Sequence, residues 1–239
     1  NPQIAERNRF LMFLYLSSLS QYFPVASSKV ACSSFSRPIS KARSGSMSVP
    51  TTRIPIKAQA DGEKKTAEVL IYQPLGSDMF GFGLDAKTFA DDLKALGQLD
   101  EITVRINSPG GSVHDGLAIF NVLVANPAAV VVHVDGLAAS AASFVAQAAS
   151  PGQLNIAENA LMMIHRAQGF TLGDSEEHLK TAEILDQHDA VISQTYARRS
   201  GRKQETMLNL MRAETWFTGQ EAKDAGLADA VTVAKKVAA

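Results

Sequence analysis

The sequence has little cysteine and almost no net charge. Cys32 is the only cysteine among 239 residues, so neither a disulfide framework nor a zinc site built on cysteines is available. Lys and Arg number 23 and Asp and Glu number 24, which gives a formal net charge of -1. A protein that holds a nucleic-acid backbone usually carries a strong basic field. We therefore expect no nucleic-acid partner.

The sequence also lacks an apolar run long enough to span a bilayer. The run "FLMFLYL", residues 10–16, is much shorter than the roughly 20 residues of a membrane-spanning helix. We therefore expect no membrane partner. Residues 1–46 contain one acidic residue, Glu6, and are crowded with serine from Ser17 onward, a composition that does not bury a core.

The N-terminal composition divides the chain into three parts. We expect residues 1–46 to be a disordered extension or a targeting segment, residues 47–65 to be a polar leader, and residues 66–239 to form one domain. With 46% hydrophobic residues, the chain can bury one full core. The expected location is the cytoplasm, with an organelle as the alternative if residues 1–46 are a transit peptide.

Strand and helix patterns alternate after the polar leader. Short β-branched runs predict strands at 68–73, 101–107 and 129–135, and apolar spacing predicts helices at 85–97 and 115–126. Strands that are nearly all apolar and are separated by helices indicate a mostly parallel sheet covered on both faces. The predicted fold class is therefore α/β.

Two further helices are predicted in the C-terminal third. Residues 175–200 form a long amphipathic pattern with acids in the first turn and arginines in the last, as the helix dipole favours. We expect this helix to project or to pack against another subunit. A shorter helix is predicted to begin at Thr218, because Thr218 and Glu221 form a capping box.

A glycine pair is the first candidate for a functional site. In "NSPGGSVHDG", residues 107–116, a predicted strand runs into Pro and two glycines before a helix begins. Adjacent glycines let the backbone approach a ligand and direct N–H groups at it. The alternative is an ordinary turn between strand and helix.

Two serines stand in the small-residue stretch "GLAASAAS", residues 136–143. Ser140 lies where a helix is predicted to start, and there a developing negative charge on oxygen is stabilised. The alternative is that Ser140 is only an N-cap. Ser143 falls within the same helix, where packing is the simpler interpretation.

His165 ends the apolar run "ALMMIHR", residues 160–166. A histidine at the end of a buried strand is either a satisfied core residue or, if it emerges beside a serine, a general base. Strand ends and helix starts meet at the carboxyl edge of such sheets, where open α/β folds bind their ligands. This placement favours the second interpretation.

The motifs together resemble the proteolytic subunit of the Clp protease (ClpP) family, and especially its phage and prophage branch, the head maturation proteases. "INSPGGSVHDGLAIFN", "VDGLAASAASFVAQAAS" and "LMMIH" occur in the family's order, and "AETWFTGQEAKDAGLAD" resembles the closing signature of the phage branch. The resemblance covers about residues 66–232. It implies a ClpP/crotonase-like spiral of βαβ units and a serine endopeptidase that needs no cofactor.

The resemblance implies a role for several residues. Ser140 would be the nucleophile and His165 the general base, and the backbone N–H groups of Gly111 and Ala141 would form the oxyanion hole. The remaining residues of the loop, Ser108, Pro109 and Gly110, would hold the substrate as an added strand.

The third member of the triad is less clear, because the segment before the closing signature contains no Asp. Glu214 is the nearest carboxylate and is the predicted orienting acid. Asp186 and Asp189 on the long helix are weaker candidates that we expect to be solvated. A Ser–His dyad or an impaired enzyme are the alternatives.

The remaining histidines are predicted to lie outside the Ser140–His165 pair. His114 is expected to line the substrate groove, His133 to lie within a strand, and His178 and His188 to belong to the surface of the long helix. We expect no metal-ligand cluster from them.

The expected partners are a peptide or protein substrate and further copies of the chain in a ring. An AAA+ unfoldase or a capsid or scaffold protein would complete the assembly, depending on whether the activity is ATPase-assisted or serves phage head maturation. Two other functions stay open. One is a non-catalytic ring subunit, and the other is an acyl-CoA enzyme of the crotonase type, which also uses glycine-loop N–H groups but needs no Ser–His pair.

Overall fold

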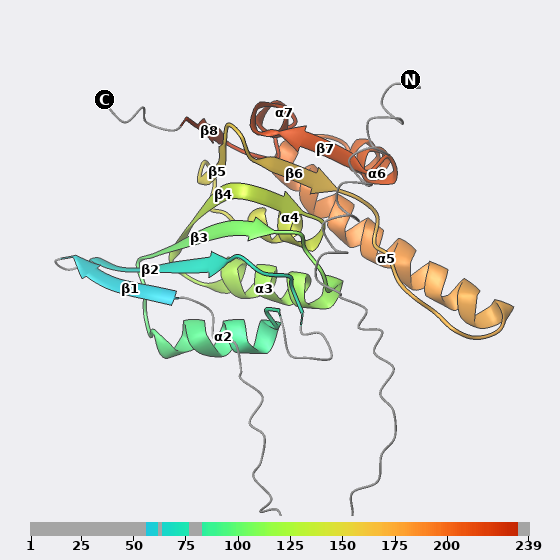
Figure 1. Ribbon diagram of the computed structural model, residues 1–239, viewed down its shortest axis with the longest axis horizontal. Helices are drawn as coiled ribbons and strands as arrows, with labels where there is room; N and C mark the ends of the chain where they lie inside the picture. Colours follow the sequence, from blue (N-terminus) through green and yellow to red (C-terminus); the bar gives the residue numbers. More distant parts are fainter. Residues whose placement is uncertain (1–55, 62–63, 77–82, 234–239) are drawn as a thin grey trace, which may run out of the picture. The chain divides into compact units, whose positions relative to one another are not determined.

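A mixed sheet forms the centre of the fold (Figure 1). The computed structural model describes residues 56–61, 64–76 and 83–233. The strands are β1 (Ile56–Asp61), β2 (Lys64–Ile71), β3 (Glu101–Ser108), β4 (Ala129–Ala139), β5 (Leu154–Ala157), β6 (Leu161–Ile164), β7 (Thr215–Thr218) and β8 (Ala230–Thr232). Their order is β1-β2-β3-β4-β5-β8, and β6 pairs with the end of β4 and with β7.

Most of the strand pairs are parallel, as the alternating pattern predicts. The antiparallel exceptions among the described residues are β1 with β2 and β6 with β7. The predicted α/β class with a mostly parallel sheet is therefore confirmed. One difference is that the sheet starts before residue 66, because β1 lies within the range expected to be a polar leader. Residues 1–46 lie outside the described residues, so their predicted character stays a prediction.

The helices lie close to their predicted positions, except the one at Gln204–Arg212, which was not predicted. They are α2 (Ala86–Ala95), α3 (Val113–Ala125), α4 (Ala141–Ala146), α5 (Ser175–Ser200), α6 (Gln204–Arg212) and α7 (Gly219–Asp224). Helix α5 has the predicted bounds, and Thr218 and Glu221 form the predicted capping box at the start of α7. Helix α3 begins two residues early because the Ser112 side chain accepts the N–H of Asp115 and caps it there.

Among the described residues, helices bury only one face of the central strands, so the prediction that both faces are covered is wrong there. In Figure 1, α2, α3 and α4 lie on the same side of β2, β3 and β4. In these strands buried residues alternate with half-buried ones, as in a sheet with one core face. The buried set includes Val69, Ile71, Ile102, Val104, Ile106, Val130, Val132 and Val134.

Polar side chains occupy the other face of the sheet, which explains why no helix covers it. Asp135 accepts hydrogen bonds from the Tyr72 hydroxyl at 2.6 Å and from Arg105 at 2.5 and 2.9 Å. His133, in strand β4 as predicted, pairs in register with Arg105. Burial and the Arg105 charge lower the pKa of His133.

In the part of the chain that the structure describes, no helix is both long and apolar enough to cross a membrane.

Candidate active site

Ser140 occupies the junction between β4 and α4 in a rare backbone conformation. Its φ is 53° and its ψ is -129°, and non-glycine residues rarely adopt a positive φ unless the surrounding structure imposes it. The side chain makes no capping hydrogen bond to α4, so the interpretation of Ser140 as only an N-cap is wrong. The Oγ atom lies 2.7 Å from Nε2 of His165 instead.

Backbone hydrogen bonds on both sides hold this conformation. The Ser140 N–H donates to the carbonyl of Met163 at 3.0 Å. The Ser140 carbonyl accepts from the N–H of Ser143 at 3.0 Å and from the Ser143 hydroxyl at 2.6 Å. The residue that presents its hydroxyl to His165 therefore has both of its backbone polar groups satisfied.

Strand pairing brings His165 to this serine. Strands β4 and β6 are parallel with Ala139 opposite Met163, so the chain leaves both strands at the same edge of the sheet. His165 follows β6 directly, and its ring is half-buried. Burial lowers the pKa of His165, while the charges of Glu214 and Asp189 oppose this shift.

Glu214 lies beside His165 because of the antiparallel pair β6 and β7. Ile164 pairs with Thr215, so the next position in register sets His165 opposite Glu214. Glu214 also has a positive φ of 47°, and its carboxylate accepts a hydrogen bond from Trp216 Nε1 at 3.4 Å. Within the described ranges, no group is hydrogen-bonded to His165 Nδ1. The structure thus brings Glu214 to the site, and its role as third member stays a prediction.

Asp189 is buried, so the expectation that it is solvated is wrong. Its side chain is 3% exposed, and it accepts the N–H of Ala167 at 2.7 Å and a hydrogen bond from Arg166. Asp186 is 70% exposed, as expected, and pairs with the same Arg166. Neither carboxylate reaches His165 Nδ1, because Asp189 binds the two residues that follow the histidine.

The glycine loop is braced by internal hydrogen bonds. The Ser108 hydroxyl donates to the Gln73 carbonyl at 2.7 Å and accepts the N–H of Gly110 at 3.2 Å. The Gly110 carbonyl accepts the N–H of Leu75 at 2.8 Å. The polar groups of Ser108 and Gly110 therefore point into the protein, and Gly111 is the exposed residue of the loop.

Gly110 lets this loop touch the serine. A Cβ atom at Gly110 would lie 2.5 Å from the Ala139 carbonyl oxygen and 2.8 Å from the Ala141 nitrogen and the Ser140 Cβ. Such distances are far below van der Waals contact, so only glycine fits. The N–H groups of Gly111 and Ala141 donate to no other residue in the described part of the chain. These are the two N–H groups predicted to form the oxyanion hole.

The other histidines differ in their surroundings. His114 is exposed near the start of α3, and its ring packs edge-to-face on His188 of α5 with centroids 5.0 Å apart. His188 is half-buried, and its Nδ1 atom is buried without a hydrogen-bond partner, so His188 is not a plain surface residue as expected. His178 is exposed on α5, as expected.

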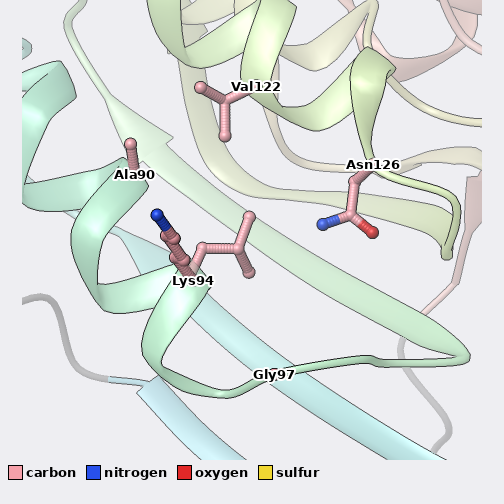
Figure 2. Close-up of a pocket in the computed structure, with 6 residues that line it drawn as sticks. Ala90, Lys94, Gly97, Val122 and Asn126 are labelled. Atoms are coloured by element: carbon pink, nitrogen blue, oxygen red, sulfur yellow. The ribbon is translucent and has the colours of Figure 1, made fainter.

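A pocket between α2 and α3 lies apart from these residues. Its volume is about 360 Å³, and it is lined by Ala90, Leu93, Lys94, Gly97, Val122 and Asn126 (Figure 2). None of the residues predicted for the site lines it. The pocket therefore plays no part in the geometry of Ser140 and His165.

Sequence reasoning missed two contacts of α5 with this region. The Tyr196 hydroxyl reaches Ser143 at 2.8 Å, and Asp189 binds Arg166 and Ala167. A tyrosine and an aspartate on a long amphipathic helix give no signal of burial by themselves. Only their spacing of seven residues indicates that they lie on one face of the helix.

Comparisons with known proteins show which family this chain resembles. The family model described as Clp protease matches residues 85–235. The ATP-dependent Clp protease proteolytic subunit of Ligilactobacillus salivarius is 38% identical over 136 residues, which are 57% of this chain and 69% of that protein. Proteolytic subunit 1 of Chlamydia abortus is 32% identical over 154 residues, which are 61% of this chain and 80% of that protein.

A solved structure shows the same fold. A ClpP1 mutant from Listeria monocytogenes superposes with a TM-score of 0.61 at 25% identity, covering 70% of this chain and 92% of that chain. The match confirms the predicted ClpP fold. Because the family model spans more than half of its residues, this chain belongs to the Clp protease family.

Proposed function

We propose that this protein is a serine endopeptidase in which Ser140 is the nucleophile and His165 the general base. The observation that carries the proposal is the 2.7 Å contact between Ser140 Oγ and His165 Nε2. Burial lowers the pKa of His165, so the imidazole is neutral near pH 7 and Nε2 can accept the hydroxyl proton. The serine is thus poised beside an unprotonated base.

The reaction then follows from these two side chains. Ser140 Oγ attacks the peptide carbonyl carbon while its proton passes to His165 Nε2. His165 gives this proton to the departing amine nitrogen, which leaves an ester on Ser140. A water molecule, deprotonated by His165, then attacks the ester and releases the acid product.

The unused backbone N–H groups support the charge that forms in this reaction. We assign the oxyanion hole to the N–H groups of Gly111 and Ala141, because neither has an internal acceptor among the described residues. Ala141 follows Ser140 in the chain, and Gly111 follows Gly110, which approaches Ser140 closely. One such donor is typically worth roughly 10²- to 10³-fold in kcat. The exposed backbone at Gly111 also gives an extended substrate a place to lie beside the Ser108–Gly110 loop.

Glu214 is the proposed acid of the site. When His165 accepts the proton it becomes an imidazolium ion, and the nearby carboxylate stabilises that charge. The same attraction between the Glu214 carboxylate and the imidazolium form acts in the resting protein, where the Glu214 charge raises the pKa of His165. The Ser–His pair carries the reaction, and Glu214 supports it.

We propose that the chain assembles with copies of itself through α5. Large apolar side chains are exposed on this helix and on the loop before it: Phe170, Leu172, Leu179, Ile184 and Val191. Large apolar side chains that are exposed in one part of a molecule favour an interaction surface there. The relatives are named as subunits of an ATP-dependent protease, so an ATPase is the partner to test first, and a capsid or scaffold protein is the alternative.

The two other functions are less well supported. An acyl-CoA enzyme has no need of a strained serine in contact with a histidine, and a non-catalytic ring subunit has no need to keep that contact. Both interpretations predict that Ser140 is unreactive.

Labelling with a fluorophosphonate probe tests the proposal. We expect the probe to react with Ser140 of the wild-type protein, as read by peptide mass spectrometry. Ser140→Ala should not react at this site. His165→Ala should react at least about 10³-fold more slowly than the wild-type protein. The matched control is His178→Ala, which removes an exposed histidine and should label at the wild-type rate. A folded wild-type protein that does not label at Ser140 would show that the proposal is wrong.

A further inference from the structure

Two buried polar side chains of α5 lie beneath the proposed site. Asp189 and Tyr196 are both about 2% exposed, whereas most of the residues in the first half of α5 are exposed. Seven residues separate them, which is close to two helical turns, so both point to the same side of the helix about 10 Å apart. One rigid helix therefore carries both groups.

Tyr196 is connected to the nucleophile through Ser143. The Ser143 hydroxyl donates its only proton to the Ser140 carbonyl at 2.6 Å. The Tyr196 hydroxyl, 2.8 Å from Ser143 Oγ, must therefore be the donor in the second hydrogen bond. Burial raises the pKa of Tyr196, which keeps this proton in place. The result is a chain of two directed hydrogen bonds from α5 to the strained residue.

Asp189 is connected to the general base through the backbone. Its carboxylate accepts the N–H of Ala167, two residues after His165, and a hydrogen bond from the Arg166 side chain. A buried carboxylate is stable only when it is paired and hydrogen-bonded. Loss of either bond would leave the Asp189 charge poorly satisfied, so Asp189, Arg166 and Ala167 are held together. They fix the chain where it leaves β6 and hence the direction of the His165 side chain.

We propose that Asp189 and Tyr196 are positioning residues, and that α5 sets the distance between Ser140 and His165 by holding each of them through one of these side chains. The inference rests on the proposed function, because it concerns the same two reacting groups. Neither Asp189 nor Tyr196 touches Ser140 Oγ or His165 Nε2. Removing either group should therefore lower kcat and leave KM nearly unchanged.

Three conservative variants separate positioning from general stability. Tyr196→Phe removes only the hydroxyl, and Asp189→Asn keeps an acceptor for Ala167 while losing the charge. Thr195→Val is the control, since it removes a buried α5 hydroxyl whose bonds go to Val191 and Arg198 rather than to the site. The second-order rate of fluorophosphonate labelling is measured for each protein at a temperature where circular dichroism shows it folded.

We expect labelling to slow by roughly 10- to 100-fold in Tyr196→Phe and in Asp189→Asn, the size of effect that a small misplacement of reacting groups produces. Thr195→Val should label within about twofold of wild type. Asp186→Asn is a second control, because Asp186 shares Arg166 but is exposed. Should Asp189→Asn not fold, Arg166→Lys tests the same link, since lysine lacks the Nε donor.

The pH profile supplies a readout that a purely structural role would not move. Glu214 and Asp189 are the negative groups that raise the pKa of His165, and Arg166 is bonded to Asp189. The labelling rate falls at low pH, where His165 becomes protonated. Loss of the Asp189 charge should move this fall, the acid limb of the profile, to lower pH, and Tyr196→Phe should leave it in place.

Wild-type labelling rates in both Tyr196→Phe and Asp189→Asn would overturn the inference and leave the proposed function standing. An equal slowing in Thr195→Val would also overturn it, because stability alone would then explain the effect. A wild-type protein that does not label would overturn the proposed function, and the inference with it.

Discussion

The stretch around Ser140 and the stretch after His165 are built in opposite ways. Residues 137–149 are mostly small and almost entirely half-buried or buried, and they hold a serine with a positive φ. The stretch from Arg166 to α5 carries large apolar side chains in water: Phe170 is 92% exposed and Leu172 is 89% exposed. The first stretch is packed within the chain, and the second leaves large apolar surface exposed.

Side-chain size accounts for this difference. Small residues let backbones approach closely, and the glycine loop uses this space to reach Ser140. Large apolar residues contribute free energy only when their surface is removed from water, at roughly 25 cal/mol per Å². The positions of Ser140 and His165 therefore depend on packing within the chain, whereas the proposed assembly would use surface that folding leaves exposed.

The largest effect is expected from Gly110→Ala, which fills the space beside Ser140. The new Cβ would lie 2.5 Å from the Ala139 carbonyl oxygen, and φ at this position is 88°. Overpacking and backbone strain together should lower the free energy of unfolding by about 3 kcal/mol and labelling at Ser140 by at least roughly 100-fold. Chemical denaturation and labelling rates measure the two effects.

Gly152→Ala is the matched control for this variant. Gly152 also has a positive φ, 77°, but a Cβ there would meet nothing within 4 Å. We expect only the strain, about 1 kcal/mol, and wild-type labelling. Equal losses in the two variants would mean that the close approach of the loop to Ser140 has no special importance.

An intermediate effect is expected from Glu214→Gln. His165 acts as a base when it is neutral, and burial lowers its pKa below 6.5, so activity should fall as the pH drops through that lowered value. Removing the Glu214 charge disfavours the imidazolium further and should move the acid limb to still lower pH, with about tenfold slower labelling at pH 7. The pH dependence of the labelling rate measures both.

Glu205→Gln, which neutralises an exposed acid in the first turn of α6, should leave this profile unchanged. An acid limb that stays in place or moves upward in Glu214→Gln would show that Glu214 does not support the imidazolium.

The smallest effect on the single chain is expected from the pair Leu179→Ser and Ile184→Ser. Both side chains are more than half exposed, so their replacement should change the free energy of unfolding by less than about 0.5 kcal/mol. The assembled mass, measured by light scattering, should fall. Unchanged mass would show that this surface is not used for assembly, and Glu183→Gln, an exposed neighbour, serves as control.

Local patterns predicted a large part of the fold. The bounds of α5 and the Thr218 capping box follow from residues within one or two turns of each other, so a single sequence displays them. The alternation of strand and helix likewise indicates a parallel sheet. Burial of only one sheet face was missed, although the sequence of β3 alternates polar and apolar residues. Thr103 and Arg105 are half-buried there between buried apolar residues, and Arg105 bonds to Asp135.

For the candidate site too, the sequence predicted some features and missed others. The motif order marks Ser140, His165 and the glycine pair, because these residue types occur at matching positions in a known family. The burial of Asp189 and the bond from Tyr196 to Ser143 were not predicted, since each joins residues that are more than 20 positions apart in the chain.

By itself, the sequence determined the candidate residues of the site and the positions of most helices and central strands, since both depend on residue type and short-range spacing. The tertiary structure alone decided that Ser140 adopts a positive φ, that its hydroxyl lies 2.7 Å from His165, and that α5 contacts both halves of the site. These features arise from the register of β4 against β6 and from close packing, which no local stretch of sequence contains.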